Sequence, residues 1–150
     1  MASKKEWGNI VWILFHTLVY KLNNEAHIGK LLEQIISICH NLPCEDCTKH
    51  ASNILKTINI SDIKTRSDII KLMLDFHNII NKRLGKDEYT IEQYNKQYSR
   101  GITGKIITQF IITMQHNNYN ERGMLHAFKR KQCLNRFIKY INEYKCNYNP

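Results

Sequence analysis

Proline and glycine are scarce in this chain of 150 residues, which has two prolines and six glycines. One of the prolines is the last residue, Pro150, so only Pro43 interrupts the sequence. Proline and glycine are the residues that most often end or break helices. Apolar residues recur at helical spacing along almost the whole chain. The sequence therefore predicts an all-α protein.

Long apolar runs are also missing. None approaches the roughly 20 residues that a membrane-spanning helix needs, so no contact with a membrane is expected. The opening residues, MASKKEWGN, have no apolar core after their lysines, and a secretory signal is not expected either. A disulfide in a chain without such a signal is more often catalytic than structural, because the cytosol keeps thiols reduced.

Negative charge is in deficit, which leaves a net charge of +9, and residues 102–150 carry eight Lys and Arg against two acids. An excess of basic residues can indicate a nucleic-acid partner. Solvated lysines on helix faces are the commoner interpretation, so binding of nucleic acid is not expected. The shift in charge coincides with a break near residues 100–104, which predicts one domain over residues 1–101 and a basic helical extension over 102–150.

Seven helices are expected from the apolar periodicity. Pro43 ends one helix and starts the next, because the residue before a proline avoids the α conformation and proline suits a first turn. Gly85 is expected to terminate a long helix as a C-cap. The predicted helices span residues 6–22, 25–40, 43–57, 67–84, 91–98, 105–116 and 124–144.

The stretch LPCEDCTKH places Cys44 and Cys47 three residues apart at an expected helix start. Residues at this spacing share a helix face, about 5–6 Å apart between their Cβ atoms, which lies within reach of a disulfide. The positive end of a helix dipole also favours a thiolate, the reactive form of cysteine. These features are typical of a redox pair.

Zinc is the main alternative for this stretch, because Cys39, His40, Cys44, Cys47 and His50 lie within twelve residues. Zinc sites usually separate two ligand pairs by a dozen or more residues, so that a loop can wrap the metal. No second C-x-x-C is present. Two inert buried thiols are the third interpretation, and this stretch alone leaves all three open.

Two other stretches carry polar and aromatic side chains at helical spacing. FHNIINKRLGK places His77, Asn78 and Asn81 along one helix stripe, although asparagine is a poor helix former. Near the N-terminus, Trp12 and His16 lie one turn apart. Each set taken alone is more often a solvated face or part of a core. Together they indicate the walls of a pocket for a flat heterocycle.

Three motifs in this order, WGNIVWILFHTL, PCEDCTKH and FHNIINKRLGK, resemble the Erv/ALR family of FAD-linked sulfhydryl oxidases over about residues 4–101. The resemblance implies a four-helix bundle with a short fifth helix, which binds FAD and forms a homodimer. It further implies oxidation of dithiols to disulfides, with electrons passing through FAD to oxygen. Because the resemblance implies a redox role for these cysteines, a metal site is no longer expected.

The resemblance also assigns roles to individual residues. Cys44 corresponds to the cysteine that exchanges disulfides with the substrate, and Cys47 to the thiolate beside the flavin. Tyr98 falls where many members have a tryptophan. The positions that resemble the cofactor-binding residues of the family are Gly8, Trp12, His16, Cys47, His50, His77, Asn78, Asn81, Leu84, Lys86 and Tyr98.

Two features depart from the family pattern. Many members join the fourth and fifth helices by a disulfide, and Leu74 and Ile91 stand at those positions. An apolar contact is expected in its place. The second departure is the extension, where Cys133 and Cys146 could form a shuttle disulfide only if their helix breaks. An accessory helical pair that packs on the bundle is the preferred interpretation, and Cys39 is expected to be a buried thiol.

The resemblance implies dithiol protein substrates or a thioredoxin-like relay protein as partners, with molecular oxygen as electron acceptor. Relatives encoded by large cytoplasmic DNA viruses lack targeting signals, and the chain's bias toward Ile, Asn and Lys fits this type. The expected location is therefore the host cytoplasm or the virion. A basic helical module that binds nucleic acid or protein without redox activity is the alternative function.

Overall fold

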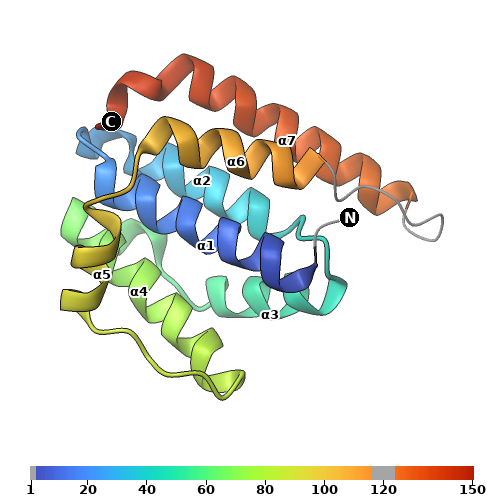
Figure 1. Ribbon diagram of the computed structural model, residues 1–150, viewed down its shortest axis with the longest axis horizontal. Helices are drawn as coiled ribbons and strands as arrows, with labels where there is room; N and C mark the ends of the chain where they lie inside the picture. Colours follow the sequence, from blue (N-terminus) through green and yellow to red (C-terminus); the bar gives the residue numbers. More distant parts are fainter. Residues whose placement is uncertain (1–2, 116–123) are drawn as a thin grey trace.

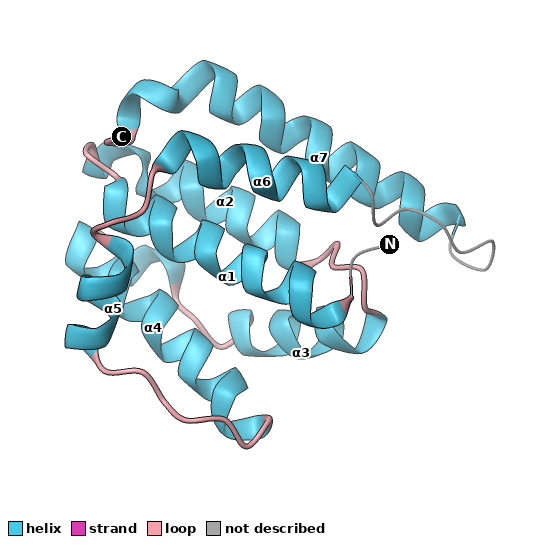
Figure 2. Ribbon diagram, in the orientation of Figure 1, coloured by secondary structure: helices cyan, strands magenta, loops and turns pink. Residues whose placement is uncertain are grey.

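The computed structural model describes residues 3–115 and 124–150, and within these ranges it consists of helices and loops without a strand (Figure 2). The all-α prediction is confirmed. Within the described residues, the short 3-10 turns η1, η2 and η4 span Glu25–His27, Ile60–Asp62 and Lys145–Asn147. The α-helices are α1 (Lys4–Lys21), α2 (Ile28–Cys39), α3 (Glu45–Leu55), α4 (Arg66–Arg83), α5 (Ile91–Tyr98), α6 (Thr103–Gln115) and α7 (Met124–Tyr144).

Capping boxes define where α1, α4 and α5 begin. In α4, the Thr65 hydroxyl accepts the backbone N–H of Asp68, and the Asp68 carboxylate accepts the N–H of Thr65. Two N–H groups that no helical carbonyl could reach are thereby satisfied. The same reciprocal pair forms at Ser3 with Glu6 and at Thr90 with Gln93.

Several predicted helix starts differ from the structure by two or three residues, among them that of α1, which begins at Lys4 rather than at residue 6. The helix expected from Pro43 begins at Glu45, because Cys44 adopts an extended backbone and serves as the N-cap. The helix expected over 25–40 begins at Ile28, because its first three expected residues form the separate turn η1. The Asn24 side chain caps this turn by accepting the N–H of Ala26. The sixth helix begins at Thr103, and its predicted end at residue 116 lies outside the described residues.

The C-terminus of α4 has the geometry predicted from Gly85, which adopts a φ of +70°. The N–H of Gly85 donates to the carbonyl of Lys82 (3.2 Å), and the N–H of Lys86 donates to that of Asn81 (2.8 Å). This pair of bonds is a Schellman motif, which ends a helix cleanly and reverses the chain. The chain then runs back along α4 toward α5.

The helices pack in layers around α1 (Figure 1). Helices α4 and α5 lie on one side of α1, and α6 lies on the other and contacts α7. Helix α2 contacts both α3 and α7. Side chains from every α-helix contribute to one buried cluster, whose largest fully buried members are Phe15, Phe76, Tyr94, Phe110 and Phe137.

The C-terminal extension belongs to this same core. The rings of Phe110 in α6 and Phe137 in α7 meet edge to face, with centroids 5.2 Å apart, and both are buried. Beyond α7, the Tyr148 hydroxyl lies 2.6 Å from that of Tyr140. The expected boundary near residue 101 therefore divides two stretches of sequence that share one core.

The last residues of the chain are joined to the start of the bundle. The N–H of Asn23, after α1, donates to the carbonyl of Asn147 (2.8 Å), and the N–H of Asn149 donates to that of Lys21 (2.7 Å). The Pro150 carbonyl accepts the N–H of Thr103 (2.9 Å). The first two bonds join the extension to the end of α1, and the third joins the last residue to the start of α6 within the extension.

The cysteines of the extension do not form a pair. Cys133 is buried within the unbroken helix α7, and its sulfur lies 3.4 Å from the Ser37 hydroxyl of α2. Cys146 is an exposed free thiol in η4, beyond the end of α7. The structure therefore gives no support to a shuttle disulfide between them. Cys39 is a buried free thiol, as predicted.

Candidate active site

The cysteine pair at the start of α3 is a disulfide. Cys44 and Cys47 are bonded, with their Cα atoms 5.2 Å apart. Cys44 is the N-cap, and its sulfur accepts the backbone N–H of Cys47 at 3.3 Å. An N–H directed at sulfur, together with the helix dipole, stabilises a thiolate on Cys44 once the bond is opened. Both residues are half-buried at the edge of the core.

The surroundings of the disulfide are open to solvent. Glu45 and Asp46 are exposed, and the ion pair of Glu45 with Lys49, at 3.8 Å, is solvated on both sides. Such pairs contribute little to stability. His50 is half-buried on the same helix. The described surface beside the disulfide is thus polar, which suits the approach of a thiol substrate.

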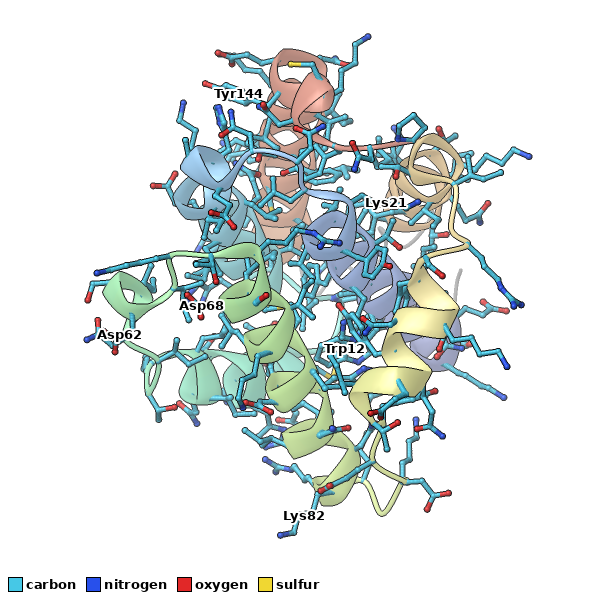
Figure 3. The ribbon with its side chains drawn as sticks, turned by 90° about the vertical axis from the view of Figure 1, so that its left-hand side faces the viewer. Trp12, Lys21, Asp62, Asp68, Lys82 and Tyr144 are labelled. Carbon is cyan, nitrogen blue, oxygen red and sulfur yellow. A yellow bond between two sulfur atoms is a disulfide. The ribbon has the colours of Figure 1, made fainter. Side chains whose placement is uncertain are left out.

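A cavity of about 600 Å³ opens between α1, α4, α5 and the segment that links α4 to α5. Its size falls within the range typical of cofactor sites. The Trp12 side chain of α1 lies between α4 and α5 in Figure 3. The lining residues are Asn9, Trp12, Ile13, His77, Ile80, Asn81, Leu84, Lys86, Asp87, Glu88, Tyr89, Gln93, Gln97 and Tyr98.

The cavity brings together six of the predicted cofactor residues from four separate parts of the chain: Trp12, His77, Asn81, Leu84, Lys86 and Tyr98. Gly8, His16, Cys47, His50 and Asn78 are not among the lining residues. Gly8 lies one turn before Trp12 on α1, and a side chain at its position would meet open space.

Sequence reasoning missed the remaining lining residues. Asn9 and Ile13 could have been found, because they lie on the same face of α1 as Trp12 at helical spacing. Gln93 and Gln97 likewise share one face of α5. The segment 87–89 carries no such signal, since its place in the wall depends on how the chain turns after Gly85.

Aromatic rings form a stack at the inner end of the cavity. The Trp12 and His77 rings are nearly parallel, with centroids 4.0 Å apart and 9° between their planes. Behind them, His16 stacks on Trp12 at 5.7 Å and lies 4.8 Å from the Tyr98 ring. Parallel rings of this kind suit contact with another flat aromatic group.

Two histidines at this stack are held neutral. Nε2 of His16 lies 2.8 Å from Nδ1 of His77, so one ring donates and the other accepts. Burial lowers the pKa of His16 to about 2, with a further contribution from His77. Burial, and then the charge of Lys86, lower the pKa of His77 to about 4. A neutral pair can hold one proton between the rings without adding charge to the cavity.

Acidification is expected to destabilise the fold through this pair. Because an unfolded His has a pKa of 6.5 and the pKa of folded His16 is about 2, the unfolded chain binds more protons between these values. Stability is therefore complete above 6.5 and declines as the pH falls below it. The expected loss for His16 is about 1.4 kcal/mol per pH unit, with a smaller loss for the more exposed His77.

Denaturant unfolding of the FAD-free protein between about pH 7 and about pH 4.5 measures this loss, in a window above the carboxylate pKa values. The double variant His16→Gln/His77→Gln should show a shallower dependence on pH. His40→Gln, on an exposed residue, is the matched control. Identical pH dependence in the wild type and the double variant would contradict the assignment.

The cavity also contains a buried polar atom without a partner. Asn81 is 4% exposed, and its Nδ2 has no hydrogen-bond partner in the structure. An unpaired buried donor costs about 1–3 kcal/mol, so it is expected where a ligand completes the bond. Flat aromatic faces, this free donor and the exposed cation of Lys86 fit a ligand with heteroaromatic rings, hydroxyls and phosphates, as FAD has.

Within residues 3–115 and 124–150, no group of three or more His, Cys, Asp and Glu side chains is arranged to hold a metal ion. In this same part of the chain, every helix is too short or too polar to cross a bilayer.

Comparison with known proteins agrees with the geometry. The model of the Erv1 / Alr family matches residues 9–99, so the chain belongs to this family. It is 31% identical over 119 residues to the "Putative FAD-linked sulfhydryl oxidase 088R" of Frog virus 3 (isolate Goorha), covering 74% of this chain and 77% of that protein.

A second relative is the FAD-linked sulfhydryl oxidase of African swine fever virus (isolate Tick/Malawi/Lil 20-1/1983). It is 29% identical over 108 residues, which cover 67% of this chain and 86% of the viral protein. No solved structure matches the chain. The family match ends at residue 99, close to the boundary expected from the charge distribution.

Proposed function

We propose that this protein is an FAD-linked sulfhydryl oxidase that forms disulfide bonds in protein substrates. One observation carries the proposal: a disulfide at a helix N-terminus, Cys44–Cys47, occurs in the same small bundle as a cavity suited to a flavin nucleotide. The membership of the Erv1 / Alr family and the names of the viral relatives support it.

The first half of the reaction is thiol–disulfide exchange at Cys44. A substrate thiolate attacks the Cys44 sulfur, the Cys44–Cys47 bond breaks, and Cys47 leaves as a thiolate. A second substrate thiolate then attacks the substrate sulfur of the mixed disulfide. The substrate departs as a disulfide, and the enzyme keeps two electrons and two protons as the reduced cysteine pair.

The second half restores the Cys44–Cys47 bond. FAD, when bound, supplies a two-electron acceptor that passes these electrons to oxygen. Asn81 would donate a hydrogen bond to the cofactor, Lys86 would pair with phosphate, and Trp12, His77 and Tyr98 would contact its rings. The neutral histidine pair keeps a positive charge away from this end of the cavity. Cys47 is assigned the position beside the flavin.

The reaction balances as two thiols and one O₂ giving one disulfide and one H₂O₂. The test is to add a small dithiol to the purified protein and to measure oxygen consumption together with peroxide formation. One peroxide is expected per disulfide formed. A flavin-containing preparation that consumes no oxygen with any dithiol or reduced protein would overturn the proposal.

The partners and location are part of the same proposal. Substrates are dithiol proteins or a thioredoxin-like relay, the enzyme acts as a homodimer, and it works in the host cytoplasm or the virion. The open surface at Cys44 is compatible with protein substrates. The viral origin of the relatives supports the location.

A further inference from the structure

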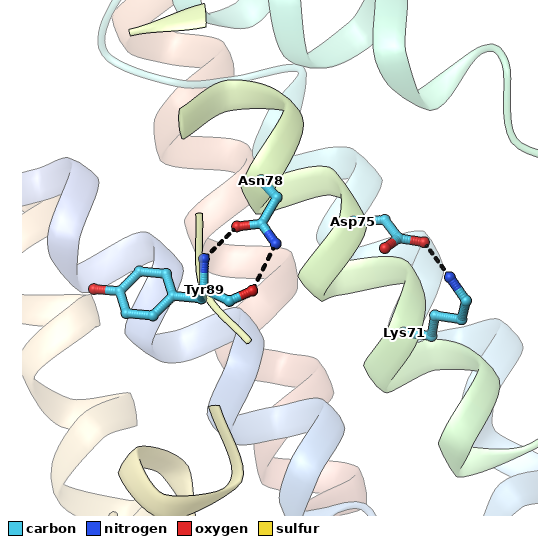
Figure 4. A network of polar contacts seen from close by, with 4 residues as sticks. All are labelled: Lys71, Asp75, Asn78 and Tyr89. Atoms are coloured by element: carbon cyan, nitrogen blue, oxygen red, sulfur yellow. Dashed lines mark hydrogen bonds and ion pairs between the residues drawn. The ribbon is translucent and has the colours of Figure 1, made fainter. Parts of the chain in front are cut away.

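Asn78 forms a two-way hydrogen bond with the backbone of a single residue, Tyr89 (Figure 4). The N–H of Tyr89 donates to Oδ1 of Asn78 at 2.8 Å, and Nδ2 of Asn78 donates to the Tyr89 carbonyl at 2.9 Å. The side-chain amide thus pairs with the chain in the way that a neighbouring strand would. We refer to these two bonds as the Asn78 clamp.

The clamp holds the outer wall of the cavity. The segment 84–89 supplies five of the lining residues, and every residue in it is exposed. It is fixed at one end by the Schellman turn at Gly85 and at the other by the capping box at Thr90. Between these points, the clamp joins the segment to α4 and sets the distance of Tyr89 from the helix.

Ile91, one partner of the apolar contact expected in this region, is 41% exposed and is not part of the buried cluster, whereas Leu74 is half-buried against that cluster. The Asn78 clamp lies one turn further along α4 and two residues earlier in the segment. It is in the right place to serve as the connection between α4 and the start of α5.

The two asparagines of α4 therefore differ in their bonding. Asn81 lines the cavity with an unpaired buried donor, whereas Asn78 lies outside the lining and pairs with backbone through both its oxygen and its nitrogen. An amide with the reach of asparagine is needed here, because aspartate lacks the donor and an aliphatic side chain lacks both groups.

We infer that Asn78 is a positioning residue, which sets the wall of the cavity by clamping Tyr89 and does not itself bind the cofactor. That the occupant is FAD rests on the proposed function. A wall already in place binds a ligand more tightly, because less disorder is lost on binding. Loss of the clamp should therefore weaken FAD binding indirectly, through movement of the segment.

Amide hydrogen exchange in the FAD-free protein tests the inference, since it reports the clamp without the cofactor. Asn78→Leu removes both bonds, and exchange at the Tyr89 N–H is expected to become at least about tenfold faster. Asn78→Asp keeps the acceptor for that N–H and should show a smaller increase. Asn135→Leu, an exposed position on α7, is the matched control and should leave the exchange unchanged.

Tyr89→Ala separates the backbone from the ring. The clamp uses only the backbone of residue 89, so its N–H should stay protected in this variant.

FAD titration should then show a dissociation constant raised about three- to tenfold for Asn78→Leu. Unchanged exchange at residue 89 in Asn78→Leu, with the fold intact by thermal unfolding, would overturn the inference. A wild type that binds no FAD would overturn the proposed function, and the exchange experiment would still decide the clamp.

Discussion

Cys44→Ser is expected to lower the rate of dithiol oxidation by on the order of a thousandfold or more while the flavin remains bound. A serine oxygen cannot form the mixed disulfide, so electrons no longer pass from the substrate to the cysteine pair. The cavity is lined by other residues, and the substitution leaves it intact. Oxygen consumption with a dithiol and the flavin content of the purified variant measure the two effects.

Cys146→Ser is the matched control for this prediction. Cys146 is an exposed free thiol at the far end of α7, so its loss should change neither turnover nor flavin content. A Cys44→Ser protein that oxidises dithiols as fast as the wild type would contradict the role assigned to the disulfide. A rate reduced equally in both variants would point instead to a general effect of losing a thiol.

Asn81→Leu is expected to weaken FAD binding and to stabilise the FAD-free protein. The bond that Nδ2 would make to the cofactor is lost, which should raise the dissociation constant about ten- to a hundredfold. In the FAD-free protein this same atom is buried without a partner. Replacing it by an apolar group removes that unfavourable burial, so the free energy of unfolding should rise by about 1 kcal/mol.

Two measurements on Asn81→Leu separate these effects: titration of the FAD-free protein with FAD, and denaturant unfolding without FAD. Opposite changes in affinity and stability are characteristic of a residue kept for binding. Asn135→Leu should change neither quantity by much. Wild-type FAD affinity in Asn81→Leu would show that Asn81 does not contact the cofactor.

Features that depend on local sequence could be predicted. The positions of α5 and α7 follow from apolar spacing, and the end of α4 follows from Gly85, whose positive φ is accessible to glycine. The spacing of Cys44 and Cys47 at a helix start made their disulfide possible, and the resemblance of three motifs to the family favoured it over a zinc site or inert thiols. In each case the deciding contacts lie within one or two turns.

Features that depend on tertiary placement could not be predicted. Asn78 and Asn81 lie on the same stripe of α4, and the sequence gives them the same role. One is paired with Tyr89 and the other is unpaired, because the chain returns along α4 after Gly85. The predicted start of α3 was wrong for a local reason: proline suits a first turn, but Cys44 rather than Pro43 lies next to the helix and supplies its cap.

The absorption spectrum of the purified protein is the most direct test of the central claim, that the Cys44–Cys47 pair exchanges electrons with a flavin held by α1, α4 and α5. We predict a visible flavin band, FAD released on denaturation, and bleaching of the band when a dithiol is added without oxygen. Bleaching should fail in Cys44→Ser. A colourless protein that releases no flavin, or a flavin band that dithiols leave unchanged, would contradict the account.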